Sequence, residues 1–195
     1  MKQLRAFLRP AFVLLGLFTL LTGLVYPVMI TAVAQTLFPH QANGSLIRVN
    51  GQVIGSGLIG QAVADPAYFW GRPSLTSPAP YNAAASAGSN LANNHPDLLA
   101  RVEARIKALQ TADPDNHQPI PVDLVTASAS GLDPHISVAA AEYQIGRVAT
   151  ARGLTATAVA QLIQTHSEGR LLGIWGEPCV NVLQLNLALA GLEEE

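Results

Sequence analysis

The stretch AFVLLGLFTLLTGLVYPVMITAV, Ala11–Val33, contains no charged residue, no Asn and no Gln. As an α-helix it would extend roughly 35 Å, slightly more than the hydrocarbon core of a bilayer. A helix satisfies its own backbone hydrogen bonds in lipid, which an irregular segment cannot do. Pro27 removes one of those bonds, so we expect a kink there. The stretch therefore predicts a transmembrane helix, which we place at residues 11–37.

The charged residues on either side of this stretch predict its orientation. Three basic residues precede it: Lys2, Arg5 and Arg9. The next charged residue along the chain is Arg48. Basic residues stay on the cytoplasmic side of a bacterial membrane. We therefore expect residues 1–10 in the cytoplasm, one pass through the inner membrane, and residues 38–195 in the periplasm.

A cleaved signal peptide is the alternative interpretation of the same stretch. The basic residues would be its n-region, and Ala32-Val33-Ala34 matches the small-residue pattern of a cleavage site. The mature protein would then be a secreted binding protein or enzyme, released after Ala34. Signal h-regions run about 7–15 residues, and the longer apolar stretch favours a retained helix. Both interpretations predict that the body of the chain is exported.

The predicted helix has a strip of small residues on one face. Gly16, Thr19 and Gly23 recur at helical spacing, and small residues let a second transmembrane helix approach closely. Gly and Thr are also common in membrane helices in general. The strip is therefore either a candidate surface for a partner helix or ordinary membrane composition.

Composition excludes several classes of function. Charged residues make up 12% of the 195 residues, about half the share of an ordinary soluble domain. The body after the apolar stretch has a net negative charge, since all 13 acidic residues lie there with eight of the 11 basic ones. A nucleic-acid binder needs a basic stripe, and a multi-pass channel needs several apolar stretches. With Cys179 as the only cysteine, neither an intrachain disulfide nor a four-thiolate zinc site can form.

The body carries local signals for a hairpin, three helices and a strand. Asn50-Gly51 lies between two short apolar runs and predicts a β-hairpin within residues 45–55. Capping residues and stops predict helices over residues 96–112, 138–152 and 156–165. Alternating apolar residues over 180–189 predict a strand. The order of these elements predicts a single α+β domain after the transmembrane helix.

A long stretch without periodicity, residues 55–94, separates the hairpin from the first of these helices. Its aromatic cluster Tyr68, Phe69 and Trp70 indicates an ordered, packed loop rather than a disordered one. Aromatic and Arg residues are common anchors at protein interfaces, so these three residues and Arg72 are candidates for a partner surface. The alternative is that Trp70 and its neighbours belong to the core.

We predict no catalytic residues and no metal ligands. The sequence lacks G-x-S-x-G and H-E-x-x-H. Ser128, Asp133 and His135 are close in sequence, but Asp133-Pro134 is typical of a turn and Ser137 of a helix cap. Three further polar residues alternate along the chain: Asp113, Asp115 and His117. They fail as a calcium loop because the glycine and glutamate positions hold Gln118 and Leu124, so we interpret them as a polar turn.

The sequence also lacks a Walker A motif. A short Gly/Ser loop, Ser86–Asn90, could form an anion-binding nest of backbone N–H groups. A flexible or turn-forming loop explains the same residues on local chemistry alone.

Six sequence blocks resemble the family of C subunits (KdpC) of the Kdp potassium-transporting ATPase, along nearly the whole chain. They are GLIGQ (57–61), YFWGRPS (68–74), SAGSNL (86–91), PVDLVTASASGLDPHIS (121–137), RVATARG (147–153) and VNVLQLNLAL (180–189). The run TASASGLD within the fourth block is highly specific to that family.

The resemblance implies a non-catalytic subunit of a bacterial ATP-driven potassium importer, needed for its assembly and activation. The implied partners are a channel-like potassium-binding subunit, a P-type ATPase subunit carrying ATP and Mg²⁺, and a small single-helix subunit. K⁺ is the transported ion. From the residues themselves we predict no cofactor on this chain.

The family is described as a catalytic chaperone that raises the affinity of the ATPase subunit for ATP. This implies a nucleotide loop at four residues: Ser86, Gly88, Ser89 and Asn90. An exported body would lie where there is no ATP, and Ala87 replaces a second glycine that is usual in the family. Contact with the extracellular mouth of the channel-like subunit fits the predicted topology better.

Overall fold

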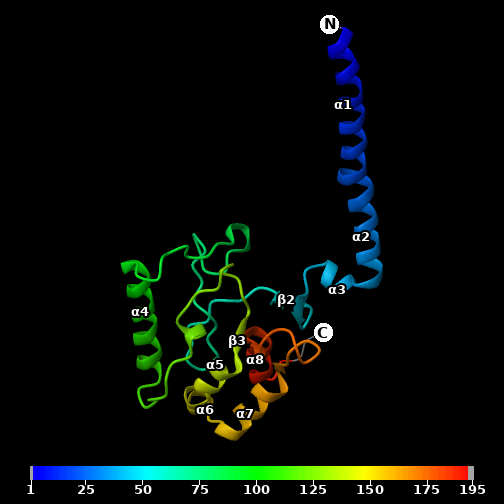
Figure 1. Cartoon of the computed structure of the whole chain (residues 1–195). Coiled ribbons are helices and arrows are strands. Elements are labelled where there is room, and N and C mark those ends of the chain that lie inside the picture. The colour runs from blue at the N-terminus through cyan, green and yellow to red at the C-terminus, as the bar shows by residue number, and fades with distance from the viewer. Residues whose placement is uncertain (1, 193–195) are drawn as a thin grey trace. The chain divides into compact units, whose positions relative to one another are not determined.

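The computed structural model describes residues 2–192, with side chains from residue 6 onward. The described chain forms two compact units, one ending at Ser45 and the other beginning at Leu46 (Figure 1). The first unit is helical and the second combines helices and strands, so the fold is α+β as expected.

The first unit is one long helix with a short helix after it. It runs through α1 (Lys2–Leu20), a π-helical turn η1 (Leu21–Val25) and α2 (Tyr26–Leu37), followed by α3 (Pro39–Ala42). Within the described residues, Ala6–Leu37 is the one helix long and apolar enough to cross a membrane. The N–H of Tyr26 donates to the carbonyl of Leu21, five residues back, just before Pro27, which has no N–H. The distortion expected at the proline is therefore accompanied by a π turn in the preceding residues.

The second unit begins with the predicted hairpin. Strands β1 (Leu46–Val49) and β2 (Gln52–Ser56) pair antiparallel. The turn residues Asn50 and Gly51 have φ of 51° and 74°, the left-handed conformation that hairpin turns require and that Asn and Gly adopt most readily. This confirms the interpretation of the Asn-Gly signal.

Two of the three predicted helices are present as single, continuous helices. They are α4 (Pro96–Ala112), capped by the His95 side chain, and α7 (Ala156–Thr165), capped by Thr155. The helix expected over 138–152 is instead two helices, α5 (Val138–Tyr143) and α6 (Ile145–Arg152). The break falls at Gln144, whose N–H closes a short turn onto Ala141. Short 3₁₀ turns occur at η2 (Ala83–Ala85) and η3 (Val122–Leu124).

A small antiparallel sheet connects the C-terminal half of the unit. Its strands are β3 (His135–Ser137), β4 (Ser167–Glu168) and β5 (Cys179–Asn181), in the order β3-β5-β4. Beyond β5 the chain forms helix α8 (Val182–Leu189), so the strand prediction is wrong for residues 182–189. Asn181 stops the strand because its side-chain oxygen accepts from the N–H groups of Leu183 and Gln184 and caps the new helix.

Dense burial explains why α8 did not show a helical period. Six of its eight residues are buried: Val182, Leu183, Leu185, Asn186, Leu187 and Leu189. A helix that is apolar on nearly every side has no amphipathic pattern to recognise. It packs on α7 in the main core, and its Leu183 and Leu187 cover the hairpin residues Ile47 and Val49.

Candidate functional site

The aromatic segment lies inside the domain, held by two buried side-chain amides. Asn186 of α8 accepts from the N–H of Phe69 at 2.8 Å and donates to its carbonyl at 3.0 Å. Gln144 accepts from the N–H of Trp70 at 2.8 Å and donates to its carbonyl at 3.1 Å. The two amides thus pair with Phe69 and Trp70 as a neighbouring strand would.

Burial settles the two alternatives for the aromatic residues. Phe69 is 0% exposed and Trp70 is 7% exposed, and both belong to the main core. The expectation that they anchor a partner is therefore corrected, because both side chains are almost entirely buried in the core of their own domain. Tyr68 is half-buried, and beside Val182 and Leu187 it lines an open cavity of about 370 Å³.

Three arginines pack against the rings of this segment. The guanidinium groups of Arg147 and Arg105 lie 4.5 and 5.2 Å from the Trp70 ring centroid. Arg152 lies 4.3 Å from that of Tyr68. Arg147 also donates to the carbonyls of Pro66 and Tyr68. Burial lowers the pKa of Arg147 to about 10, so it remains charged at neutral pH, and the ring and carbonyls compensate its partial desolvation.

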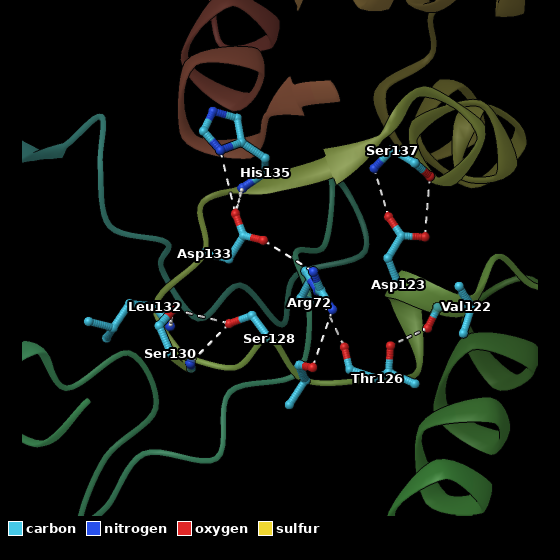
Figure 2. Close-up of polar contacts among 12 residues, drawn as sticks. Arg72, Val122, Asp123, Thr126, Ser128, Ser130, Leu132, Asp133, His135 and Ser137 are labelled. Carbon is cyan, nitrogen blue, oxygen red and sulfur yellow. Dashed lines mark hydrogen bonds and ion pairs between the residues drawn. The ribbon is translucent and has the colours of Figure 1, made fainter. Parts of the chain in front are cut away.

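The Arg72 side chain also bonds within its own domain, as Figure 2 shows. It forms an ion pair with Asp133 at 3.1 Å and donates to the carbonyl of Ala127 at 3.2 Å. Asp133 accepts from the backbone N–H of His135 and lies 3.5 Å from its Nδ1. Hydrogen bonding to His135 lowers the pKa of Asp133, and the same interaction raises the pKa of His135. Arg72 therefore connects two chain segments and is not a free anchor.

Ser137 caps α5, as the sequence indicated. Its hydroxyl accepts from the N–H of Ala140 at 3.0 Å, and Asp123 accepts from both its N–H and its hydroxyl (Figure 2). The Asp113–His117 stretch forms a polar turn in which Asn116 bonds to the backbone and the carboxylate of Asp113.

The candidate nucleotide loop packs against the fourth family block. The Ser86 hydroxyl and the Ala87 N–H both donate to the carbonyl of Ser130. A Cβ added to Gly88 would lie 2.8 Å from the carbonyl oxygen of Ala129. Glycine is therefore required here by close backbone approach, which gives the Gly/Ser composition a packing reason.

All six blocks of the family resemblance belong to one hydrogen-bonded scaffold. The first block meets the fourth and the sixth through Gly60–Leu132 and Asn181–Gly57 bonds. The second meets the fourth through a bond from Ser74 to Gly131. The third block bonds to the fourth through Ser86 and Ser130. The fifth block bonds to the second through Arg147 and Tyr68. The recognisable blocks thus build the fold, and a candidate partner surface lies outside them.

Such a surface lies in residues 169–178, which we call the apolar loop, between β4 and β5. Four large side chains there are 63–78% exposed: Leu171, Leu172, Ile174 and Trp175. The backbones of Leu171 and Trp175 pair in both directions, and an Arg170–Glu177 ion pair at 2.8 Å closes the base. Leu172 and Gly173 have φ of 53° and 73°. Exposed apolar clusters of this kind mark interaction sites.

Sequence reasoning missed the apolar loop, although the run LLGIW was visible. The run has neither helical nor alternating periodicity, so it gave no secondary-structure signal. Only the folded chain shows that these side chains stay largely exposed among the residues the structure describes.

The small-residue strip lies open on α1 and η1. A Cβ added at Gly16 or Gly23 would meet no atom within 4 Å. Together with Thr19 these glycines line a shallow groove bordered by larger side chains: Phe12, Leu15, Leu20 and Leu24.

The fold also brings together three possible metal ligands, a grouping that the sequence did not indicate. Donor atoms of His135, Glu168 and Cys179 all lie within 4.8 Å of one another. Burial raises the pKa of the Cys179 thiol, and the carboxylates of Glu168 and Asp133 raise it further. The sequence concealed the group because its members are far apart along the chain.

Comparison with known proteins agrees with the six blocks. Residues 8–191 match the family model described as KdpC, K⁺-transporting ATPase, c chain. A potassium-transporting ATPase KdpC subunit of Sorangium cellulosum is 61% identical over 95% of this chain and 98% of its own length. The same-named proteins of Herpetosiphon aurantiacus and Methylococcus capsulatus are 60% and 58% identical, over 95% and 94% of this chain and 96% and 97% of their own lengths.

Proposed function

The chain belongs to the KdpC family of potassium-transporting ATPase subunits, and we propose that it joins its complex through the apolar loop and the helix groove. It is an accessory subunit of an ATP-driven potassium importer. Its partners would be a channel-like potassium-binding subunit, a P-type ATPase subunit that carries ATP and Mg²⁺, and a small single-helix subunit.

The exposed apolar loop is the observation that carries this proposal. Leaving four large apolar side chains in water is unfavourable, by about 25 cal/mol for each Å² of apolar surface that a partner could cover. Trp is also the residue most enriched among interface anchors. The loop would dock on the exported face of the channel-like subunit, and the acidic body would mildly concentrate cations near its mouth.

An indirect effect on ATP affinity follows from this placement. The Ser86–Asn90 loop packs on Ser130 and Ala129, and it would lie on the side of the membrane without ATP. The chain would therefore act on the nucleotide site of the ATPase subunit through the complex rather than by contact with ATP.

Charged substitutions in the apolar loop test the docking surface. Leu172→Asp with Trp175→Asp should reduce co-purification of the full chain with the other subunits at least tenfold, because desolvating two carboxylates opposes docking. Growth at limiting potassium should fall with it. Leu99→Asp is the matched control, because Leu99 is also an exposed leucine, on α4, and should leave co-purification unchanged. Normal recovery of the complex with the doubly substituted loop would refute the docking surface.

The same pull-down tests the helix groove. Leucine at both Gly16 and Gly23 would fill the groove and should release the chain from the complex while leaving it in the membrane. Leu14→Phe, which the helical period places on the opposite face, is the control. Unchanged co-purification of the glycine variant would mean that the small residues are ordinary membrane composition.

The proposed topology places residues 1–10 in the cytoplasm, crosses the inner membrane once within residues 11–37, and exports residues 38–195. A reporter that is active only in the periplasm should therefore be active when fused after Glu195. A reporter that is active only in the cytoplasm should be silent there, and activity from it would overturn the orientation. The size of the mature chain distinguishes this topology from cleavage after Ala34. A retained helix predicts full-length chain in the membrane fraction, and cleavage predicts a shorter soluble chain.

A further inference from the structure

The register of the small sheet places three metal-binding side chains on one face. Glu168 of β4 pairs directly with Cys179 of the central strand β5. On the other side Cys179 pairs with Ser137, so His135, two residues earlier on β3, is its diagonal neighbour. Alternation along a strand puts these side chains on the same face. The intervening Ile136 and Val180 point to the opposite face, where both are buried in the core.

The donor atoms are close enough to share one ion. The imidazole, carboxylate and thiol donors all lie within 4.8 Å of one another. A tetrahedral zinc site has bonds of about 2.0–2.3 Å, which places its donors about 3.5 Å apart. To reach the spacing of a zinc site, the donor atoms would have to move about 1 Å closer to one another. The exposed Glu168 side chain has room for such a movement.

The surroundings supply two further features of metal sites. Asp133 lies 3.5 Å from Nδ1 of His135, so it can orient the ring as carboxylates do behind metal-bound histidines, and Nε2 would then be the nitrogen that binds an ion. His135 and Cys179 also line an open cavity of about 460 Å³, through which an ion and a water as fourth ligand can enter.

We propose that His135, Glu168 and Cys179 form a binding site for Zn²⁺ or a similar borderline divalent metal. Thiolate and imidazole ligands select such metals, whereas Mg²⁺ is held by oxygen ligands. Three protein ligands with one open position match the zinc sites that also bind water. Binding deprotonates the Cys179 thiol and releases that proton to solvent.

The position of the site gives it a structural consequence. Glu168 and Cys179 immediately flank the apolar loop, so an ion bound to both closes the base of that loop. The same ion joins all three strands of the sheet, including β4, which has only two residues. Metal binding should therefore restrain residues 169–178 without changing the buried core.

Metal titration of the full chain tests the site. The untagged protein, purified in detergent with reductant and stripped by a chelator, should bind one Zn²⁺ per chain in equilibrium dialysis. With Co²⁺ as the probe, it should show the near-ultraviolet absorption band of a cobalt–thiolate bond. Amide hydrogen exchange in residues 169–178 should slow when Zn²⁺ is bound.

Matched substitutions separate this site from binding elsewhere. Glu168→Gln and His135→Gln should each weaken Zn²⁺ binding at least tenfold, and Cys179→Ser should remove the cobalt–thiolate band. His95→Gln, which alters the cap of α4 away from the site, should change neither. The proposal is overturned if the unsubstituted chain binds no Zn²⁺ at micromolar concentration, or if Zn²⁺ affinity is unchanged in Glu168→Gln and Cys179→Ser.

Discussion

Trp70→Ala is expected to lower the free energy of unfolding of the α+β domain by about 3–5 kcal/mol. The ring is buried, its Nε1 donates to the carbonyl of Asp65 at 3.0 Å, and two arginines pack against it. Truncation leaves a cavity and removes the aromatic face from the buried Arg147 and from Arg105. Urea unfolding of the full chain in detergent, followed by circular dichroism, measures the loss.

Trp175→Ala is the matched comparison, because the same residue type is changed at an exposed position. It should alter the unfolding free energy by less than about 0.5 kcal/mol and should weaken co-purification with the partner subunits. The two tryptophans therefore predict opposite patterns of damage. A stability loss at Trp175 as large as that at Trp70 would contradict the assignment of the apolar loop as surface.

Gln144→Leu is expected to destabilise the domain by about 2–6 kcal/mol. Leucine has nearly the same volume but leaves the N–H and the carbonyl of Trp70 without the partners that Gln144 provides. Each buried backbone group without a partner costs about 1–3 kcal/mol. The substitution also removes the oxygen that accepts from Arg147 at 2.6 Å. The same urea unfolding measurement applies.

Gln164→Leu on α7 is the control for that substitution, because Gln164 is exposed. Its effect should stay within about 0.5 kcal/mol. If Gln144→Leu were equally mild, the hydrogen bonds to Trp70 would not be what fixes the aromatic segment.

Features set by neighbouring residues could be predicted from the sequence. Local chemistry decides the membrane-spanning length of the first helix, the Asn50-Gly51 turn, and the helix caps at Ser137 and Thr155. The structure has each of these features. The family resemblance was equally accessible, because its blocks are continuous in the chain. None of these needs information about what packs against what.

Features set by distant residues could not be predicted in the same way. Periodicity suggested a strand over 182–189, but burial on nearly every side made α8 a helix without an amphipathic pattern. The break at Gln144 falls at the residue whose side-chain amide pairs with Trp70, which is 74 residues away. The apolar residues of the loop were visible in the sequence, yet only their exposure in the described structure makes the loop a candidate surface.

The sequence by itself determined that this is a KdpC-type subunit with one helix able to span a membrane and an α+β body. Tertiary structure decided which of its residues are available for function. Trp70 is buried and Arg72 is bound in an ion pair, whereas Trp175 is exposed. The donor atoms of His135, Glu168 and Cys179 lie within 4.8 Å of one another. The physical reason is that exposure and ligand geometry depend on contacts between strands and helices far apart in the chain, and local chemistry does not encode those contacts.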